Sequence, residues 1–501
     1  MSHDRAAVQA VLDGARAVGR VSLTSTESKQ VSDAYGISIP QEGLATSSDE
    51  AATLAEEIGY PVVLKVNSKD ILHKTEAGGV LVNLTTASDV SKGYDTIIKN
   101  AQAYKSDAEI AGVQVQQMLP PGQEVIVGAV TDPSFGKLVA FGLGGILVEV
   151  LKDVTFRLAP ASHEDALSMI DGIKAAEVLR GVRGSDPVNR DALATLIENV
   201  SALIGDFPEI QELDLNPVLA TSESVTAVDV RILLAQELPE PRPRPSQQEI
   251  LASMVRIMQP KAVAVIGASA EDGKIGNSVM KNLINGGYAG EIYPINPKAS
   301  EVMGHACFKS VKDIPGEVDI AVFAIPAKFV AGALEEVGQK GIAGAVMIPS
   351  GFAEVGETEL QDELVAAARK NNVRIMGPNI YGFYYTPANL CATFCTPYDV
   401  KGKTALSSQS GGVGMSIIGY SRSTKMGVSA IVGLGNKSDL DEDDLLTYFE
   451  QDDNTDVCAM HAEDLKDGRS FAEVAKRVSK KKPIIMLKAG RTQLGARAAA
   501  S

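Results

Sequence analysis

The sequence predicts a multidomain protein of the α/β and α+β classes, and three observations support this. The 501 residues correspond to roughly three domains of about 150 residues each. Apolar residues make up 45% of the chain and charged residues 22%, which is typical of globular proteins with packed cores. From residue 260 onward, short apolar runs alternate with helical patterns, and this βαβ alternation indicates parallel sheets.

Charge and hydropathy exclude two classes of partner. The formal net charge of −16 argues against nucleic acid, because such binding requires Lys and Arg to neutralise phosphates. The most apolar run, residues 138–151, is too short to span a bilayer and contains Glu149, so we expect no membrane partner. Residues 1–19 have the pattern of a short amphipathic helix rather than a signal peptide. The four cysteines show no pairing pattern, so we expect a cytoplasmic protein with free thiols.

The first predicted domain covers residues 1–236 and is of the α+β type. Two helices, at 27–35 and 51–58, alternate with strands at 61–66, 80–84, 113–118, 124–130 and 138–141. Residues 237–258 form the predicted linker. Prolines in its first half alternate with charged or polar residues, which favours an extended chain.

Residues 61–80 bring a lysine, a histidine and a glycine pair close together in sequence. Lys65 stands near the end of a strand, where a cation can reach a phosphate as a point charge. A polar loop carrying His73 and the glycine pair 78–79 follows. A neutral imidazole is a nucleophile near pH 7, so His73 is a candidate acceptor of a phosphoryl group. A surface histidine beside a hairpin is the alternative interpretation.

Acidic residues alternate with leucines later in the same domain. Period-two alternation over residues 211–216 puts Asp214 and Asn216 on one face of a strand. A further strand, predicted over 225–232, carries Asp229. Hard oxygen ligands on adjacent strands suit Mg²⁺ bound to a nucleotide. A solvated strand face is the alternative, but the upstream lysine and a glycine-rich segment favour a nucleotide site.

The second predicted domain, residues 259–396, opens with an apolar strand at 262–267. Further strands at 291–295, 319–325, 343–348 and 373–376, with helices between them, predict a doubly wound parallel sheet. The first loop lacks the G-x-G-x-x-G fingerprint, which disfavours an NAD(P)-dependent dehydrogenase. The second strand is followed not by an acid but by Asn296, Pro297 and Lys298. A lysine there suits the phosphorylated ribose of CoA, although an ordinary surface lysine is the alternative.

The third predicted domain, residues 397–501, is again α/β. Strands at 404–407, 428–432, 457–460 and 483–488 alternate with helices at 412–420, 441–450 and 468–479. The segment 407–414, SSQSGGVG, leaves free N–H groups at a helix start, and such a terminus binds phosphate. We expect the chain to be a fragment, because this domain is unfinished at Ser501.

Taken together, these motifs resemble the ADP-forming acyl-CoA synthetases, relatives of succinyl-CoA synthetase. The matching N-terminal motifs are VLKVNSKDILHKTEAGGV, QQMLPPGQEVIVG, FGLGGILVEVLKDVTFRLAP, ELDLNPV and AVDVRI. The segments 325–327, 350–354 and 377–379 resemble the CoA-binding domain of the same family. The resemblance covers nearly the whole chain. It implies an ATP-grasp domain, a Rossmann-like CoA-binding domain and an incomplete flavodoxin-like domain, in that order.

The resemblance also implies roles for individual residues. On the nucleotide side, Lys65 would contact the phosphates, and Gln116 to Met118 would line the adenine pocket. Glu124 would contact the nucleotide. Mg²⁺ would be held by Asn216, Asp229 and Asp214. His73 matches a histidine that exchanges phosphate with a mobile phosphohistidine loop. Glu463 matches a glutamate that orients the phosphorylated imidazole, and the implied phosphate contacts are Asn379, Ser410, Gly411 and Gly412. The implied CoA contacts are Gly267, Ala268, Ser269, Lys274, Asn296, Pro297, Lys298, Ile325, Pro326, Ser350 and Gly351.

The implied activity is the ligation of an acid to CoA with conversion of ATP to ADP and phosphate. Its cofactors and substrates would be ATP or ADP, Mg²⁺, CoA and a small carboxylic acid, and we expect a homodimer. Two features depart from the family pattern: Ile380 stands where relatives commonly have cysteine, and an aromatic run, 381–385, follows as a loop at the expected acyl site. We favour a short-chain acid, with 4-hydroxybutyrate and 3-hydroxypropionate as candidates. The alternative is a non-catalytic regulatory module that binds CoA or nucleotide, because the phosphate-carrying histidine that follows Ser501 in relatives is absent.

Overall fold

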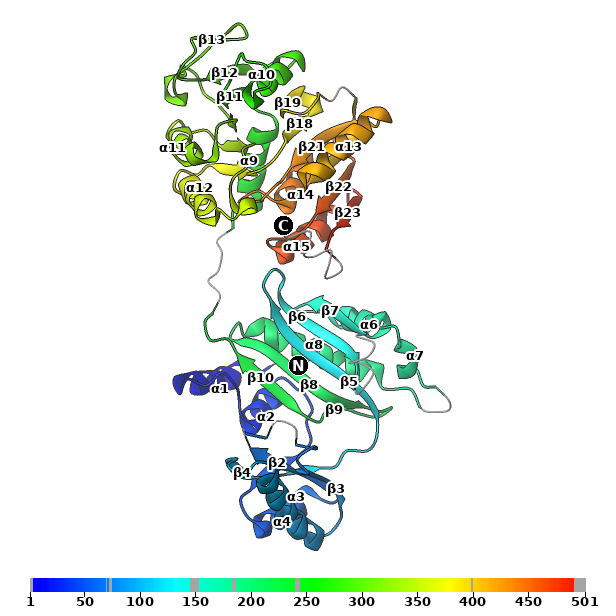
Figure 1. Cartoon of the computed structure of the whole chain (residues 1–501). Coiled ribbons are helices and arrows are strands. Elements are labelled where there is room, and N and C mark those ends of the chain that lie inside the picture. Colours follow the sequence, from blue (N-terminus) through cyan, green and yellow to red (C-terminus); the bar gives the residue numbers. More distant parts are fainter. Residues whose placement is uncertain are drawn as a thin grey trace. The chain divides into compact units, whose positions relative to one another are not determined.

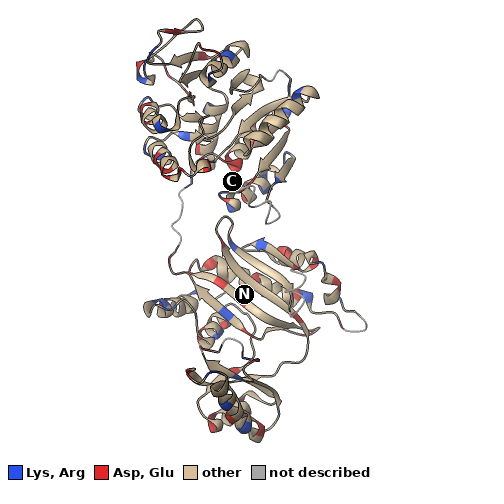
Figure 2. Ribbon diagram, viewed as in Figure 1, with Lys and Arg blue, Asp and Glu red and all other residues tan. Residues whose placement is uncertain are grey.

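The computed structural model describes residues 3–68, 70–71, 74–144, 153–182, 186–238, 244–397 and 400–490. The chain divides into two compact units, Met1–Glu240 and Pro241–Ser501 (Figure 1). Charged residues lie mainly on helices and loops, whereas most residues of the strands are uncharged (Figure 2). Within the described ranges, no helix is long and apolar enough to cross a membrane.

The first unit contains a four-stranded antiparallel sheet of order β1-β4-β2-β3. Its strands are β1 (Glu42–Ala45), β2 (Val62–Ser68), β3 (Val80–Leu84) and β4 (Ile110–Gln117). Two helices, α3 (Ser48–Ile58) and α4 (Ala87–Tyr104), pack against this sheet around a common apolar core. Both helices begin at a hydroxyl cap: Ser47 accepts from the N–H of Glu50, and Thr86 from that of Asp89.

The other sheet of this unit has the order β10-β8-β5-β6-β7, with β9 paired to β8. Its strands are β5 (Gln123–Asp132), β6 (Gly136–Leu143), β7 (Val154–Leu158), β8 (Ile210–Ala220), β9 (Val225–Ala227) and β10 (Val230–Leu234). The helices of this part are α1 (Arg5–Ala17), α2 (Ser25–Ala34), α6 (His163–Gly172), α7 (Ala176–Leu179) and α8 (Arg190–Asp206). The core between this sheet and its helices is apolar, and buried side chains of α8 form part of it.

The prediction of one continuous strand over 225–232 was wrong. The pairing with β8 is interrupted between β9 and β10. At this break the N–H of Val228 donates to the carbonyl of Pro217 at 2.9 Å. The carboxylate of Asp229 then accepts from the N–H of Val230 at 3.0 Å. The break exposes Asp229 at a turn instead of holding it in the middle of a strand.

The second unit begins with a five-stranded parallel sheet of order β12-β11-β15-β16-β17, which confirms the doubly wound prediction. The strands are β11 (Ala262–Ile266), β12 (Glu291–Ile295), β15 (Ile320–Phe323), β16 (Gly344–Met347) and β17 (Arg374–Met376). The helices are α9 (Gln247–Met258), α10 (Ile275–Asn285), α11 (Val330–Gln339) and α12 (Thr358–Lys370), and β13 (Glu301–Val302) with β14 (His305–Ala306) forms a small hairpin. The central strands are buried along their whole length, as expected for a sheet covered on both faces.

A six-stranded sheet of order β19-β18-β21-β20-β22-β23 completes the second unit. Its strands are β18 (Gly382–Tyr385), β19 (Leu390–Thr393), β20 (Lys401–Ser408), β21 (Val428–Gly433), β22 (Val457–Ala462) and β23 (Ile484–Lys488). The helices are α13 (Gly411–Ser423), α14 (Glu442–Gln451) and α15 (Gly468–Val478). Because β18 pairs with β21, this sheet begins before residue 397.

The aromatic run 381–385 is therefore mostly a buried strand, and its prediction as a loop was wrong. Two of its hydroxyls have acceptors in the fold. The hydroxyl of Tyr384 donates to the carbonyl of Thr396 at 2.6 Å, and that of Tyr385 to the carboxylate of Asp452 at 3.0 Å. Aromatic side chains suit a strand, and these polar partners allow complete burial.

Candidate nucleotide, CoA and phosphate sites

In the first unit, a group of polar side chains surrounds Lys65. Gln116, on β4, is 3% exposed and donates its amide to the carboxylate of Glu42 at 2.8 Å and to the carbonyl of Val228 at 3.1 Å. The strand register pairs Glu42 with Gln116 and brings Lys65 onto the neighbouring strand β2. The turn that carries Asp229 is thus joined to the four-stranded sheet through Gln116.

Burial and neighbouring charges shift the pKa values of Lys65 and Glu42. Burial lowers the pKa of Lys65, and the nearby carboxylates of Asp229 and Glu42 oppose that shift. Burial also raises the pKa of Glu42, against the hydrogen bond from Gln116 and the charge of Lys65. A half-buried cation interacts more strongly with an arriving anion than an exposed cation does, since less water screens the pair. Glu42 was not predicted, because its role depends on the pairing of β1 with β4.

The predicted metal ligands lie on β8 and at the β9–β10 turn. Leu213 and Leu215 are buried, whereas Asp214 is half-buried and Asn216 exposed, so the predicted alternation is confirmed. Burial raises the pKa of Asp214, and the charges of its acidic neighbours, Asp229 among them, raise it further. Asp214 and Asp229 are therefore close enough to interact. Two carboxylates and an amide oxygen, open to water and phosphate, fit the ligand preference of Mg²⁺.

Two further nucleotide-side predictions lie at strand ends. The N–H of Met118 donates to the carbonyl of Pro61 at 3.1 Å, which ties the end of β4 to the beginning of β2. Glu124 is exposed at the start of β5, and its carbonyl accepts from the N–H of Gly144 at 2.9 Å. Glu124 consequently lies beside Gly144, the residue directly after β6. His73 and Gly145 lie outside the described residues.

The predicted CoA contacts surround one cavity of about 1000 Å³ at the carboxyl ends of the parallel strands. Every predicted residue lines it except Ala268 and Gly351. The lining predicted residues are Gly267, Ser269, Lys274, Asn296, Pro297, Lys298, Ile325, Pro326 and Ser350. Ala268 is fully buried, and its carbonyl accepts from the side chain of Asn296 at 2.8 Å, so it supports the wall from behind.

Close backbone contact forms the floor of the cavity. A Cβ added to Gly276 would stand 1.9 Å from the carbonyl oxygen of Gly267, so only glycine lets α10 approach β11 this closely. Lys274 is the N-cap residue of α10 and makes no side-chain capping hydrogen bond, and no described side chain accepts from the N–H groups of Ile275 and Gly276. The side chain of Asn296 also accepts from the N–H of Lys298 at 2.9 Å and thereby fixes the turn that presents this lysine.

Lys309 and Phe329 line the same cavity and were not predicted. Phe329 is 56% exposed at the end of a 3-10 helix, Ala327–Phe329, where an aromatic ring can stack on a base. It follows the predicted pair Ile325 and Pro326 closely, so the sequence held a signal for it. Lys309 comes from a separate loop after β14, and no local pattern marks it.

Three of the predicted phosphate contacts, Ser410, Gly411 and Gly412, stand at the start of α13. Ser410 caps this helix by accepting from the N–H of Val413 at 3.4 Å, and a hollow of about 560 Å³ is lined by Ser410 and Gly412 among others. Apart from the chain neighbours and the backbone of α13 itself, no described atom lies within 4 Å of the position of a Cβ at Gly411 or Gly412. The loop of Asn379 adjoins this helix, because the Tyr381 ring occupies the space beside Gly414.

Glu463 follows β22 and is held through its main chain. Its N–H donates to the side-chain oxygen of Gln409 at 2.8 Å, and its carbonyl accepts from Lys488 at 2.6 Å. No described residue donates a hydrogen bond to its carboxylate. The carboxylate is consequently available to an incoming group, as expected for a residue that orients an imidazole.

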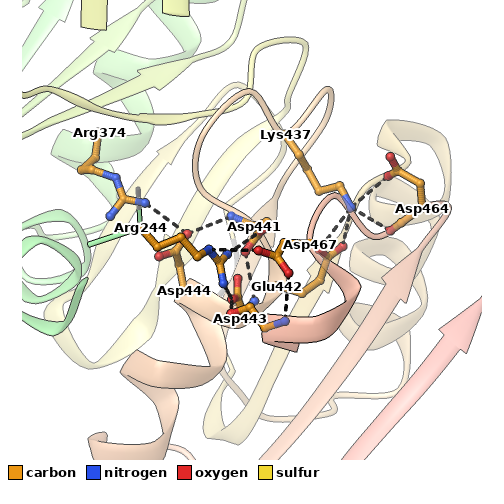
Figure 3. A network of polar contacts seen from close by, with 10 residues as sticks. Arg244, Arg374, Lys437, Asp441, Glu442, Asp443, Asp444, Asp464 and Asp467 are labelled. Atoms are coloured by element: carbon orange, nitrogen blue, oxygen red, sulfur yellow. Dashed lines mark hydrogen bonds and ion pairs between the residues drawn. The ribbon is translucent and has the colours of Figure 1, made fainter. Parts of the chain in front are cut away.

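Three carboxylates at the start of α14, Asp441, Asp443 and Asp444, lie within 4.8 Å of one another, the only such group among the described residues. They are already paired with arginines (Figure 3): Arg244 lies 2.5 Å from Asp443, and Arg374 lies 3.1 Å from Asp444. Burial raises the pKa of Asp444 to about 7, against the charge of Arg374. Because guanidinium groups supply the counter-charge, we assign no metal to this cluster.

Comparison with known proteins gives three family matches in chain order. Residues 14–234 match the ATP-grasp domain, residues 261–386 the CoA binding domain, and residues 401–501 the succinyl-CoA ligase like flavodoxin domain.

Curated relatives agree with these matches. The ADP-forming acetate–CoA ligase II of Archaeoglobus fulgidus is 37% identical over 488 residues, which are 96% of this chain and 69% of that protein. The ADP-forming 4-hydroxybutyrate–CoA ligase of Nitrosopumilus maritimus is 43% identical over 231 residues, 46% of this chain and 33% of that protein. Among solved structures, an acetyl-coenzyme A synthetase 1 of Ca. Korarchaeum cryptofilum in complex with phosphate and ADP is 46% identical, with a TM-score of 0.49. That match covers 49% of this chain and 54% of the other.

Proposed function

Since the chain belongs to the ADP-forming acyl-CoA ligases, we propose that it joins a short-chain carboxylic acid to CoA and converts ATP to ADP and phosphate. The observation that carries this proposal is the separation of two sites on two units. A cation with acidic neighbours lies in the first unit, and a cavity large enough for CoA lies in the second.

The first unit, residues 1–236, would bind the nucleotide. Lys65 would neutralise phosphate charge, and the amide of Gln116 would remain engaged with Glu42 and Val228 at the edge of the base pocket. Asp214, Asn216 and Asp229 would hold Mg²⁺, which when bound supplies charge neutralisation to the phosphates. Glu124, beside Gly144, would contact the nucleotide from β5.

The second unit would bind CoA at its five-stranded parallel sheet and phosphate at its six-stranded sheet, which β18 joins from before residue 397. Lys274, Lys298 and Lys309, which line the cavity, would contact the phosphates of CoA, and Phe329 would stack on its base. The N-terminus of α13 would receive the phosphoryl group through free N–H groups, as helix N-termini do for anions. Glu463 would accept a hydrogen bond from the imidazole that carries this group.

The reaction would proceed in four transfers. The terminal P–O bond of ATP breaks and a P–N bond forms at His73, with ADP leaving. The phosphoryl group would then move to the histidine of the mobile loop, where a new P–N bond forms as the one at His73 breaks. The P–N bond then breaks as a carboxylate oxygen of the acid attacks phosphorus, which gives an acyl phosphate. Finally the CoA sulfur, after loss of its proton, attacks the carbonyl carbon, a C–S bond forms and phosphate leaves. Dividing the reaction into these transfers replaces one difficult step by several easier ones.

For the acid itself we propose a small aliphatic substrate. Two relatives are named for acetate and for 4-hydroxybutyrate, and 3-hydroxypropionate is the third candidate. The homodimer and the cytoplasmic location expected from the sequence remain predictions, and sedimentation of the native protein tests the first of them.

The experiment is a thioester assay with CoA, Mg²⁺ and ATP over a series of acids from acetate to hexanoate, with the two hydroxy acids included. We expect thioester to form with the shortest members and to fall off as the chain lengthens. No thioester from any acid in the presence of ATP would refute the proposal.

A further inference from the structure

Gln409 is a residue to which neither the family resemblance nor the sequence motifs assign a role. It lies directly before Ser410, the cap of α13, at the end of β20. Its own N–H donates to the carbonyl of His461 at 3.0 Å, so its backbone continues the ladder between β20 and β22. Its side chain is therefore presented from a fixed strand end towards the loop after β22.

The carboxamide of Gln409 makes three hydrogen bonds with that loop. The oxygen accepts from the N–H of Glu463 at 2.8 Å and from that of Asp464 at 3.2 Å. The nitrogen donates to the carboxylate of Asp464 at 2.7 Å. A carboxamide can accept from main-chain N–H groups with its oxygen and donate to a carboxylate with its nitrogen at the same time.

A buried lysine, Lys437, also holds this loop (Figure 3). The Nζ of Lys437 lies 2.9 Å from the carboxylate of Asp464 and donates to the carbonyl of the same residue at 2.8 Å. The same Nζ also forms an ion pair with the carboxylate of Glu442 at 3.1 Å. The charge of Lys437 helps to lower the pKa of Asp464, which keeps this carboxylate ionised as an acceptor for Gln409. The main chain of Glu463 is thus fixed, while its carboxylate remains unpaired among the described residues.

We propose that Gln409 is a positioning residue that sets the place of the Glu463 carboxylate relative to the phosphate-binding start of α13. A phosphorylated imidazole needs both groups at once: N–H donors around the phosphate and a carboxylate at the other ring nitrogen. Gln409 joins the two, because its backbone leads into the helix start and its side chain holds the carboxylate's loop. This inference rests on the proposed function, since it takes the phosphohistidine to bind at α13.

The test compares Gln409→Leu and Gln409→Glu in the native enzyme. Leucine removes all three hydrogen bonds, and glutamate keeps the acceptor but places a second carboxylate against Asp464. Displacement of a catalytic group by about 1 Å can cost a hundredfold in rate. We expect kcat for thioester formation to fall about tenfold to a hundredfold in Gln409→Leu and less in Gln409→Glu, with the KM for CoA changed less than twofold. Gln451→Leu, an exposed glutamine at the end of α14, is the matched control and should behave as wild type.

A second readout does not depend on activity. Amide hydrogen exchange at Glu463 and Asp464 should become at least tenfold faster in Gln409→Leu, because both N–H groups lose their acceptor, while exchange in β11 and β15 stays the same. Unchanged exchange at these two amides, or an unchanged kcat in a stably folded variant, would overturn the inference. A lower melting temperature together with weaker CoA binding in Gln409→Leu would also overturn the inference, since this pair of changes would show a general folding role. A wild-type enzyme that forms no thioester would instead refute the proposed function.

Discussion

Replacement of Lys298 by alanine tests how the second unit recognises CoA. Lys298 is exposed at the cavity, and the side chain of Asn296 fixes its turn. No described residue forms an ion pair with Lys298, so its charge is available to a ligand. If the sequence-based interpretation is correct, this charge meets the 3′-phosphate of the CoA ribose.

The magnitude follows from the position of the lysine at the surface. Two unit charges about 4 Å apart attract by about 1 kcal/mol in water and about 4 kcal/mol at an effective dielectric constant of about 20. An exposed lysine lies near the aqueous limit, so we expect a loss of about 1 to 2 kcal/mol. That corresponds to a Kd for CoA about five to thirty times higher, at about 1.4 kcal/mol for each factor of ten.

Titration calorimetry with CoA and with dephospho-CoA isolates the contact. Dephospho-CoA lacks the 3′-phosphate, so Lys298→Ala should leave its affinity unchanged while weakening that of CoA. Lys281→Ala is the matched control, because Lys281 is paired with Asp272 at 2.5 Å and does not line the cavity. Equal weakening of both ligands would show that Lys298 supports the cavity in some other way. If Lys309→Ala alone produced the selective loss, the phosphate contact would belong to Lys309.

Three further predictions concern other parts of the chain. Asp229→Ala should weaken binding of Mg²⁺-nucleotide at least tenfold in calorimetry and leave CoA binding intact; equal loss of both would indicate misfolding. His73→Ala should abolish ATP-dependent thioester formation but not the conversion of acyl phosphate and CoA, and full turnover would exclude a relay through His73. Because burial raises the pKa of Asp444 from 3.8 to about 7, the folded state keeps a proton that the unfolded state releases. The unfolding free energy should therefore fall by up to about 4 kcal/mol between pH 4 and 7, level off above pH 7, and lose this slope in Asp444→Asn, as chemical denaturation would show.

Local sequence patterns predicted the elements that bury an alternating or continuous apolar run. The strands around Lys65, the parallel strand β11 and the helix α13 all follow from such runs and from glycine or hydroxyl caps. The aromatic strand β18 was missed because the run 381–385, with four aromatic residues out of five, shows no alternation of apolar and polar residues. Its burial depends on acceptors far along the chain, such as Asp452.

The residues of the candidate sites likewise fall into two groups: those that the local sequence predicts and those that only the folded structure reveals. Asn296 and Lys298 follow a strand whose end the sequence reveals, so their place at the cavity could be predicted. Glu42 and Lys309 join their sites only through strand pairing and loop packing, and the residues beside them in sequence do not indicate this. Gln409 stands within a predicted motif, but its hydrogen bonds reach a loop more than fifty residues later.

The most direct test of the account follows the phosphorus of ATP during thioester formation. Phosphorus NMR of the native enzyme with ATP, Mg²⁺, CoA and a short-chain acid should show ADP and inorganic phosphate, each formed one for one with the thioester. That ratio is required if the terminal phosphoryl group moves through a histidine to the acid and is then displaced by CoA. Formation of AMP and pyrophosphate with the thioester, or hydrolysis of ATP without any thioester, would contradict the account.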